Sequence, residues 1–514
     1  MNHDYFSTRP KGTPVMGATT ASLPLDQFLA NLQSRLHTVF STLYTEKHAT
    51  RRGMPEGFLD QAMEASPLSV FIPERFGGRG QRVQECLAML ETCSYESLPL
   101  SLTMGINGAL FLQPVSKYAE EETQRYSFDR FLNHKALGGL MITEPDFGSD
   151  ALQMQTRFSR TGDEYHLRGT KHWGGLTGQA DFWLLTARGE TDRGELERAI
   201  SFFVWDRNLG GIEVEEYFRN LGLYMIPYGR NLIDTTIPAN RRLTPLSSGV
   251  RMLLDLLHRS RLQFPGMAMG YLRRLLDEAI SHTRSRMVGG RPLGDYDQVQ
   301  DRLAELQASY TACSAMCAFT TGVAGVDRDC SEDALPANSI KTVVTDLMQS
   351  AAQSLLQLVG AKGYRLDHPA GRALVDSRPF QIFEGSNDIL YQQVSEAVLK
   401  SMAKLKETNL YRFLRSFDLT SRSAEYFREN LDLQPDRAMP QRKLVDLGRA
   451  LSRIISIQMV LDLGDRGYRR DLIDNCLEML RREVKVVLTS FSDKACTTVV
   501  EDYHEGSSWL QFTP

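Results

Sequence analysis

The spacing of apolar residues changes twice along this chain, and this change limits the possible folds more than any single motif does. From about residue 25 to residue 135 apolar residues recur at intervals of three and four, as on an amphipathic helix. Between Gly138 and about Thr244 they form short β-rich runs separated by Gly, Asp and Asn. After Ser248 the helical spacing returns. The order predicts a mainly α protein with a β domain inserted between helical domains.

The chain of 514 residues is too long for one ordinary core. The later helical segments are long enough to pack as an antiparallel four-helix bundle, and we expect them at about 249–288, 297–324, 336–360 and 384–404. We predict an N-terminal helical domain, a small β-barrel-like middle domain, a helical bundle domain and an additional C-terminal helical region, at residues 1–137, 138–248, 249–404 and 405–514.

The composition is that of a soluble globular protein, with 42% hydrophobic and 24% charged residues. A net charge of -4 provides no basic field for nucleic acid, so we expect no nucleic-acid partner. No run approaches the roughly 18 apolar residues that a membrane span needs. Residues 1–22 lack the apolar segment of a secretory signal. We therefore expect a cytoplasmic protein.

Cysteine usage agrees with a reducing compartment. The number is odd and no CxxC pair occurs, which favours reduced thiols over a disulfide framework. Cys313 and Cys317 could share a helix face, but two thiols without further ligands do not make a zinc site, so no metal is expected. The seven cysteines are Cys86, Cys93, Cys313, Cys317, Cys330, Cys476 and Cys496.

Glu384 is the candidate base. It lies in the run Gln-Ile-Phe-Glu-Gly-Ser-Asn-Asp-Ile at residues 381–389, next to a glycine and between apolar residues. Partial desolvation by Ile382, Phe383 and Ile389 would raise the pKa of the carboxylate toward neutrality. Such a group can remove a weakly acidic C–H proton. The alternative is an ordinary helix end or turn, for which a Glu-Gly pair is also typical.

Two segments of the β region are typical of ligand-binding turns. The run Met-Ile-Thr-Glu-Pro-Asp-Phe-Gly-Ser-Asp at residues 141–150 leaves a strand and turns sharply, so that backbone donors could approach an anion. A simple hairpin turn explains it equally well. The run at residues 167–175 places Trp173 at a strand end beside two glycines. This Trp either covers a planar cofactor or fills a core.

Together these segments resemble the acyl-CoA dehydrogenase family of flavoproteins, over the region from about Pro67 to Lys404. Several motifs occur in the family's order and approximate spacing, which is more specific than any one of them. They are Ile-Pro-Glu-x-x-Gly-Gly-x-Gly at 72–80, Thr-Glu-Pro-x-x-Gly-Ser-Asp at 143–150, Gly-Thr-Lys-x-Trp at 169–173, Gln-x-x-Gly-Ala-x-Gly-Tyr at 357–364, Pro369, Arg-x-x-x-Asp at 372–376 and the Glu384 run.

The resemblance implies FAD between the β domain and the bundle, across a contact in a homodimer or homotetramer. The matching positions are Ile142, Thr143, Trp173 and Gly175 beside the isoalloxazine, Gly148 and Ser149 for phosphate, Arg286, Gln357 and Gly360 for the adenine half in a neighbouring subunit, and Ser386 and Asp388 from the Glu384 turn. Arg261 matches an arginine near the active site. Ser149 and Gly385 match positions that contact substrate.

The resemblance also implies a reaction. Glu384 would remove the α-proton of an acyl thioester while the β-hydride passes to flavin N5, which gives a 2-enoyl thioester. Preorganised donors must stabilise the enolate oxygen, and in the family these are a flavin ribityl hydroxyl and the backbone N–H of the glutamate. The substrate would be an acyl-CoA or a carrier-protein-bound acyl group. We expect an electron-transfer flavoprotein, rather than oxygen, to reoxidise the reduced FAD.

The chain departs from the family pattern at several positions. Gly175 occupies the place of a Thr or Ser that bonds flavin N5, for which Thr177 or a backbone N–H is the possible substitute. The Arg-x-x-Phe clamp keeps Arg286 but has Gly289 in place of Phe, with Asp297 where Gln is usual. His258 replaces an aspartate three residues before Arg261. An oxidase that uses oxygen and a non-catalytic flavin-binding or assembly protein therefore stay as alternatives.

About a hundred residues follow Lys404, where family members of ordinary length end. Apolar residues from Leu444 to Ile455 form an amphipathic stripe flanked by arginines and a lysine. We predict that this stripe packs on the body of the protein, because amphipathic helices usually face their own core. Contact with a membrane surface is the less favoured alternative.

Overall fold

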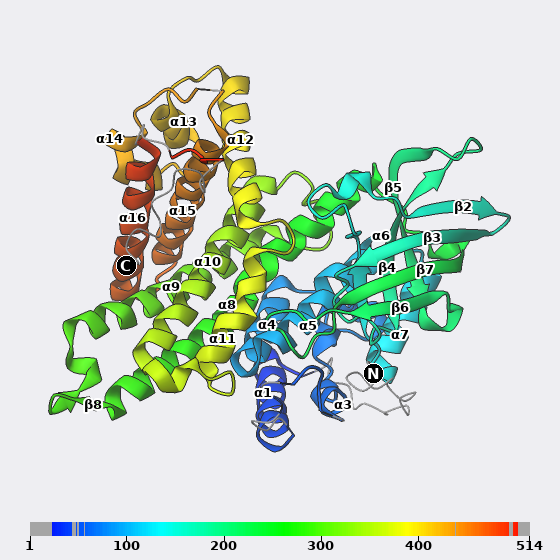
Figure 1. Ribbon diagram of the computed structural model, residues 1–514, viewed down its shortest axis with the longest axis horizontal. Helices are drawn as coiled ribbons and strands as arrows, with labels where there is room; N and C mark the ends of the chain where they lie inside the picture. The colour runs from blue at the N-terminus through cyan, green and yellow to red at the C-terminus, as the bar shows by residue number, and fades with distance from the viewer. Residues whose placement is uncertain are drawn as a thin grey trace, which may run out of the picture.

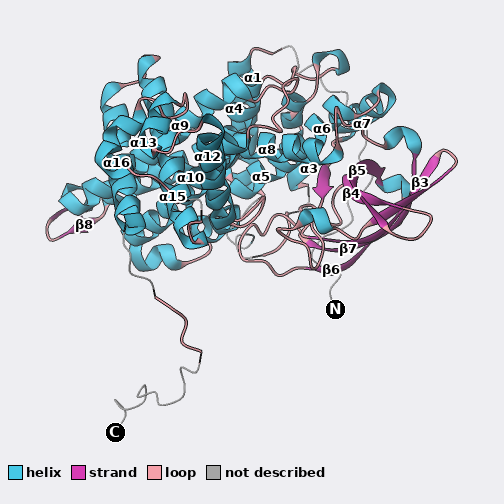
Figure 2. Ribbon diagram, turned by 90° about the horizontal axis from the view of Figure 1, so that it is seen from above, coloured by secondary structure: helices cyan, strands magenta, loops and turns pink. Residues whose placement is uncertain are grey.

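The structure is a computed structural model that describes residues 23–43, 48, 51–55, 57–436, 438–492 and 497–501. It confirms a mainly helical protein with an inserted β domain. The strands gather at one side of the molecule, and the bundle and the C-terminal extension form the other (Figures 1 and 2). Residues 1–22, in which we expect no secretory signal, lie outside the described residues, and so does Cys496.

The N-terminal part is helical, as predicted, and it breaks near residue 72. A β-carbon on Gly78 would lie 2.1 Å from the carbonyl oxygen of Ile72, so the chain folds back on itself more closely than a side chain allows. The α-helices are α1 (Leu25–Thr42), α3 (Phe58–Met63), α4 (Val83–Glu96), α5 (Leu98–Asn107), α6 (Gln113–Tyr118) and α7 (Glu121–His134), with 3-10 turns at Pro67–Phe71 and Glu74–Phe76.

One stretch is more apolar than the sequence analysis expected. Helices α5 and α6, joined by a π-helical turn at Gly108–Leu112, form a continuous run over Leu98–Tyr118 that is long and apolar enough to cross a membrane. Its most apolar window is 94% buried inside the protein. Such burial is that of a core helix, and the run packs against α4, α8 and β1.

The middle part is a seven-stranded sheet. Its strands are β1 (Gly138–Met141), β2 (Arg157–Thr161), β3 (Glu164–His172), β4 (Phe182–Glu190), β5 (Leu196–Asp206), β6 (Ile212–Tyr217) and β7 (Gly229–Pro238). The order is β1-β4-β2-β3-β7-β6, and β5, which is outside this order, also pairs with β4. Strands β1 and β2 run parallel to β4, and the other pairs are antiparallel. Trp183, Phe202 and Phe203 are buried, and because Phe202 and Phe203 are adjacent in β5 they lie on opposite faces, so both faces of the sheet are covered there.

Four long helices follow the sheet close to their predicted positions: α8 (Gly249–Ser285), α9 (Asp297–Val323), α10 (Ala334–Val359) and α12 (Asn387–Leu405). The side chain of Ser248 caps α8 by accepting a hydrogen bond from the Arg251 N–H. Helices α9 and α10 both pack on α8. A short hairpin, β8 (Met287–Val288) and β9 (Arg291–Pro292), joins α8 to α9, and α11 (Pro369–Ser377) lies between α10 and α12.

The C-terminal extension comprises α13 (Leu410–Ser416), α14 (Arg428–Leu431), α15 (Gln441–Asp465) and α16 (Arg470–Ser492). Helix α15 lies against α9, α10 and α12, and α16 lies against α15 and α9 (Figure 1). Leu447, Leu451 and Ile454 are fully buried there. The prediction that the stripe packs on the body of the protein is confirmed, so these side chains do not face a membrane surface.

We expect Gly448→Ala to destabilise the protein, because its β-carbon would lie 1.8 Å from the carbonyl oxygen of Tyr391 on α12. Overpacking of this kind costs about 1–3 kcal/mol. Gly464→Ala in the same helix is the control, since its β-carbon would lie 3.4 Å from Ile473, and the better helix propensity of alanine contributes up to about 1 kcal/mol. Thermal unfolding at one scan rate compares the two. A midpoint for Gly448→Ala at or above that of Gly464→Ala would contradict this packing.

Candidate active site

Glu384 lies on a strained turn that precedes α12. Its φ is 52° and that of Gly385 is 90°, and a left-handed conformation is unfavourable for a residue with a β-carbon. Two cations hold the backbone of this turn. The Nε of Arg261, on α8, donates to the Glu384 carbonyl (3.1 Å), and the Nζ of Lys341, on α10, donates to the Gly385 carbonyl (2.8 Å). Both side chains are buried.

The Glu384 carboxylate is held by one oxygen only. The Oγ of Ser260 donates to its Oε1 at 2.9 Å, whereas Oε2 is buried and has no hydrogen-bond partner among the described residues. Burial raises the pKa of Glu384 and outweighs the opposing influence of Arg261, Ser260 and Lys341. The direction is the one that the sequence predicted. The neighbour that we expected to exclude water, Ile382, is nevertheless 56% exposed.

Arg261 is fixed on its other side by α10. Its Nη1 donates to the Oδ1 of Asn338 (2.7 Å), and the Nδ2 of Asn338 donates to the Oε1 of Gln393 on α12 (3.1 Å). His258 lies one turn away and is buried, with its Nδ1 2.8 Å from the Cys330 carbonyl oxygen. Burial and the charge of Arg261 lower the pKa of His258 to about 4. The ring is therefore neutral at pH 7 and adds no charge beside Arg261.

Lys341 was missed by the sequence analysis, although the sequence carries a signal for it. Lys341 and Asp346 are the only charged residues in the 26-residue helix α10, whose other residues are apolar or neutral. An isolated charge in a buried helix needs a specific partner. Lys341 finds it in the Gly385 carbonyl and in the Oδ1 of Asn387 (2.9 Å), and burial lowers its pKa to about 7.

The β domain presents an exposed aromatic ring. The His172 N–H donates to the Thr143 carbonyl (2.7 Å), which brings Thr143 and Ile142 beside Trp173. Trp173 has a φ of 57° and is 52% exposed, with its ring centroid 4.5 Å from that of Phe218. Of the two sequence-based interpretations, the core position is wrong. The ring offers a flat surface to a ligand.

The glycine turns at Gly148 and Gly175 differ in how tightly they are packed. Gly148 and Ser149 are exposed, and a β-carbon on Gly148 would meet nothing within 4 Å. A β-carbon on Gly175 would lie 2.8 Å from the Cδ1 of Ile106 on α5. Thr177 is fully buried and donates to the Gly174 carbonyl (2.7 Å). The suggestion that its hydroxyl replaces the missing flavin N5 donor is therefore wrong.

The remaining predicted positions lie at or just beyond the ends of the bundle helices α8, α10 and α12. Arg286 directly follows α8, Gln357 lies in the last turn of α10 and Gly360 directly follows that helix; all three are exposed. The β8 hairpin, which begins beside Arg286, lies at the opposite end of the molecule from the β domain (Figures 1 and 2). Asp388 is exposed, 3.7 Å from an Nη2 of Arg449 on α15.

The β domain is joined to the bundle at α11. The Oδ1 of Asp376 accepts a hydrogen bond from the Leu223 N–H (2.5 Å), and a β-carbon on Gly222 would lie 2.1 Å from the Val375 carbonyl oxygen. Burial raises the pKa of Asp376 to about 6, in spite of the nearby charge of Arg372. This contact gives a structural role to the aspartate of the Arg-x-x-x-Asp motif. It sets the position of the sheet relative to the helix before the Glu384 turn.

Comparison with known families gives three matches in chain order. They are the N-terminal, middle and C-terminal domains of acyl-CoA dehydrogenase, at residues 33–134, 139–235 and 247–399. The chain belongs to the acyl-CoA dehydrogenase family. It is thus an oxidoreductase of the acyl-CoA dehydrogenase type, as the sequence predicted. The matches end before the C-terminal extension.

Individual relatives agree with this assignment. Glutaryl-CoA dehydrogenase of Desulfococcus multivorans is 28% identical over 324 residues, which cover 62% of this chain and 82% of that protein. The butyryl-CoA dehydrogenase structure from Megasphaera elsdenii has a TM-score of 0.64 at 20% identity and covers 74% of this chain and all of its own. A Bacillus anthracis acyl-CoA dehydrogenase structure reaches a TM-score of 0.73 at 17% identity, covering 93% of this chain and 91% of its own. Its coverage includes part of the extension.

We expect Glu384→Gln to raise thermal stability at pH 8 by about 1–3 °C, with a smaller difference at pH 5. The folded protein holds the pKa of Glu384 above its unfolded value, so the stability that the neutral acid contributes is lost as pH rises through the folded pKa. Glutamine does not titrate and escapes this loss. Unfolding midpoints at both pH values test it, with the exposed Glu213→Gln as the control. A difference that does not change with pH would contradict the raised pKa.

Proposed function

We propose that this protein is an FAD-dependent dehydrogenase that converts an acyl thioester, taken as an acyl-CoA, into the 2-enoyl thioester, with Glu384 as the base. One observation carries the proposal: a carboxylate with a raised pKa keeps one buried oxygen unpaired, on a turn that two cations hold in a strained conformation. Backbone strain and a perturbed pKa at one residue favour a functional site over a structural one.

The two carboxylate oxygens of Glu384 have separate tasks in this proposal. Ser260 orients the group through Oε1, which leaves Oε2 to take the α-proton of the substrate. Burial makes the carboxylate a stronger base than it is in water. The enolate oxygen that develops needs donors already in place, and the backbone N–H groups of the Glu384 turn, with Arg261 behind them, are the chain's own candidates. Ser149 and Gly385 are the proposed substrate contacts.

The residues present fit FAD as the cofactor. The exposed ring of Trp173, with Ile142, Thr143 and Gly175, offers a surface for the flavin ring, and the open turn at Gly148 and Ser149 offers room for phosphate. Ser386 and Asp388 are the proposed contacts from the Glu384 turn. Bound FAD would supply the acceptor for the β-hydride, which no side chain can supply. Relatives of the same fold are described as complexes with FAD and FADH2.

The proposal includes a second subunit. Arg286 directly precedes the β8 hairpin, which lies at the opposite end of the molecule from the β domain (Figures 1 and 2), so we propose that Arg286, with Gln357 and Gly360, contacts the cofactor of a neighbouring chain. A homodimer or homotetramer supports this arrangement. We propose the cytoplasm as its compartment, since the six cysteines among the described residues are all free thiols. An electron-transfer flavoprotein is the proposed acceptor for the electrons of reduced FAD.

Glu384→Gln should lower the rate of flavin bleaching by acyl-CoA about 10²–10⁴-fold, which is the usual contribution of a general base. Stopped-flow absorbance with a panel of acyl-CoAs measures it, after the flavin content of each protein has been determined. Glu213→Gln, on the exposed side of the β domain, should bleach at the wild-type rate. If the flavin of Glu384→Gln is bleached at the wild-type rate, Glu384 is not the base.

The electron acceptor separates the dehydrogenase from an oxidase. The solved prolyl acyl carrier protein oxidase AnaB shares this fold, with a TM-score of 0.66 at 18% identity. We expect substrate-reduced protein to release only traces of peroxide in air and to pass its electrons to an electron-transfer flavoprotein. Peroxide equal to the enoyl product would identify an oxidase instead. The same panel offered on a carrier protein would distinguish that substrate from CoA.

A further inference from the structure

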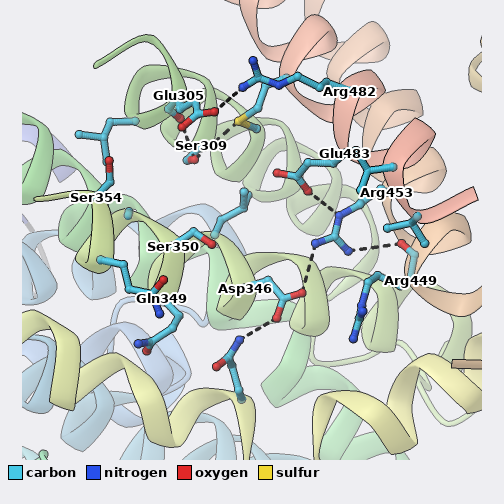
Figure 3. Close-up of a pocket in the computed structure, with 18 of the residues that line it drawn as sticks. Glu305, Ser309, Asp346, Gln349, Ser350, Ser354, Arg449, Arg453, Arg482 and Glu483 are labelled. Atoms are coloured by element: carbon cyan, nitrogen blue, oxygen red, sulfur yellow. Dashed lines mark hydrogen bonds and ion pairs between the residues drawn. The ribbon is translucent and has the colours of Figure 1, made fainter. Parts of the chain in front are cut away.

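A buried arginine of the C-terminal extension reaches into the bundle. Arg453 lies on α15 and is only 7% exposed. Its guanidinium lies between two carboxylates, Glu483 on α16 (Nε to Oε2, 2.5 Å) and Asp346 on α10 (Nη2 to Oδ2, 3.2 Å), as Figure 3 shows. The three side chains line a cavity of about 880 Å3 between the extension and the bundle.

Asp346 also binds the residues on either side of the Glu384 turn. Its Oδ1 accepts one hydrogen bond from the Nε2 of Gln381 and another from the Nδ2 of Asn387, both at 2.8 Å. Gln381 is the last residue before the turn, and Asn387 is the first residue of α12 after it. A single carboxylate oxygen therefore ties together the two ends of the segment that carries Glu384.

The same network continues to the turn itself. Asn387 accepts from Lys341 through its own Oδ1, and Lys341 also donates to the Gly385 carbonyl. The other oxygen of Asp346 accepts from the hydroxyl of Tyr391 (2.6 Å), which also accepts from the Nη1 of Arg453 (3.1 Å). A continuous chain of hydrogen bonds thus runs from α15 to the residue after Glu384.

The charge of Asp346 depends on Arg453. Burial disfavours the charged carboxylate, but Arg453 and the hydrogen bonds from Tyr391 and Gln381 outweigh it and keep the pKa of Asp346 below its usual range. A buried ion that loses its partner is strongly unfavourable and either takes up a proton or rearranges. A protonated Asp346 would accept hydrogen bonds less strongly from both ends of the turn.

We propose that Arg453 is a positioning residue: through Asp346, the C-terminal extension holds the strained turn that aims Glu384 at the substrate. This inference rests on the proposed role of Glu384 as the base. Arg453 lies beyond residue 399, where the match to the family's C-terminal domain ends, so the extension supplies part of the support of the active site. The alternative is that Arg453 only attaches the extension to the bundle.

The chain offers a matched control for that alternative. Arg482 on α16 also joins the extension to the bundle, through Glu305 and Asp301 on α9, and it lies in the same cavity (Figure 3). Within the described part of the chain, its hydrogen bonds and ion pairs do not reach Asp346 or the Glu384 turn. Arg482→Met therefore weakens attachment and leaves the turn in place, whereas Arg453→Met affects both.

The test compares Arg453→Met, Arg453→Lys and Arg482→Met as flavin-loaded full-length proteins. Stopped-flow bleaching by an acyl-CoA that the wild type turns over gives the limiting rate and the half-saturating concentration separately. A misplaced base can lower a rate by about 10²-fold, so we expect Arg453→Met to lose about 10- to 100-fold in limiting rate. Its half-saturating concentration should change little, and Arg453→Lys, which keeps the charge, should recover part of the rate. Arg482→Met should bleach at the wild-type rate.

Deuterium uptake gives a second readout that does not require turnover. Peptides that cover residues 381–389 should exchange faster in Arg453→Met than in Arg482→Met, because the hydrogen bonds from Gln381 and Asn387 to Asp346 are weakened. Equal losses of rate in the two arginine variants, or equal uptake, would overturn the proposal. If the wild type is not bleached by any acyl-CoA, the proposed function fails, and uptake alone still decides whether Arg453 holds the turn.

Asp346→Asn covers the case in which Arg453→Met does not fold. It keeps the size of the side chain and removes the charge that holds Gln381 and Asn387. Its limiting rate should fall at least as far as that of Arg453→Met, with faster uptake over the same residues. A wild-type limiting rate in folded Asp346→Asn would equally overturn the proposal.

Discussion

The hydrogen bonds to the carbonyl groups of Glu384 and Gly385 are the constraint on which the site depends. A glutamate in the left-handed region is unfavourable and persists only if the surroundings hold it there, whereas Gly385 adopts its positive φ at no steric cost. Arg261 and Lys341 do this from two different helices of the bundle. The four-helix packing therefore has a direct chemical consequence, because it determines where one carboxylate points.

The electrostatics of the site follow from the same arrangement. Three ionisable groups lie together in a region from which water is largely excluded, and burial raises the pKa of Glu384 while it lowers that of Lys341. Each cation donates to a backbone carbonyl of the turn, so neither neutralises the free oxygen of the carboxylate. The base stays available although Arg261 and Lys341 are close. The extension adds a further layer, because Arg453 keeps Asp346 charged and Asp346 closes the turn.

Much of the fold was predictable because periodicity is a local property. The helices of the bundle begin and end within a few residues of their predicted positions, and the strands begin at Gly138 as expected. The last helical segment, expected from about residue 384, begins at Asn387, and residues 384–386 form the turn on which the motif placed Glu384. Glu384, Arg261 and Trp173 were named from motifs. Lys341 and Ser260 were not, and Asp376 was part of a motif without a role, because each acts through a partner that is distant in sequence.

The sequence by itself determined the alternation of helical and β segments, the family and the identity of the candidate base, since each of these is written in local spacing and residue type. The tertiary structure decided the rest. It exposed Trp173, for which residue type alone left a core position open. It placed the hydroxyl of Thr177 in a hydrogen bond inside the β domain, and it buried the stripe of α15 against the bundle. It also brought Arg453 to Asp346, 107 residues away along the chain. Such contacts depend on how helices pack against one another, and packing is a property of the whole chain that no local pattern encodes.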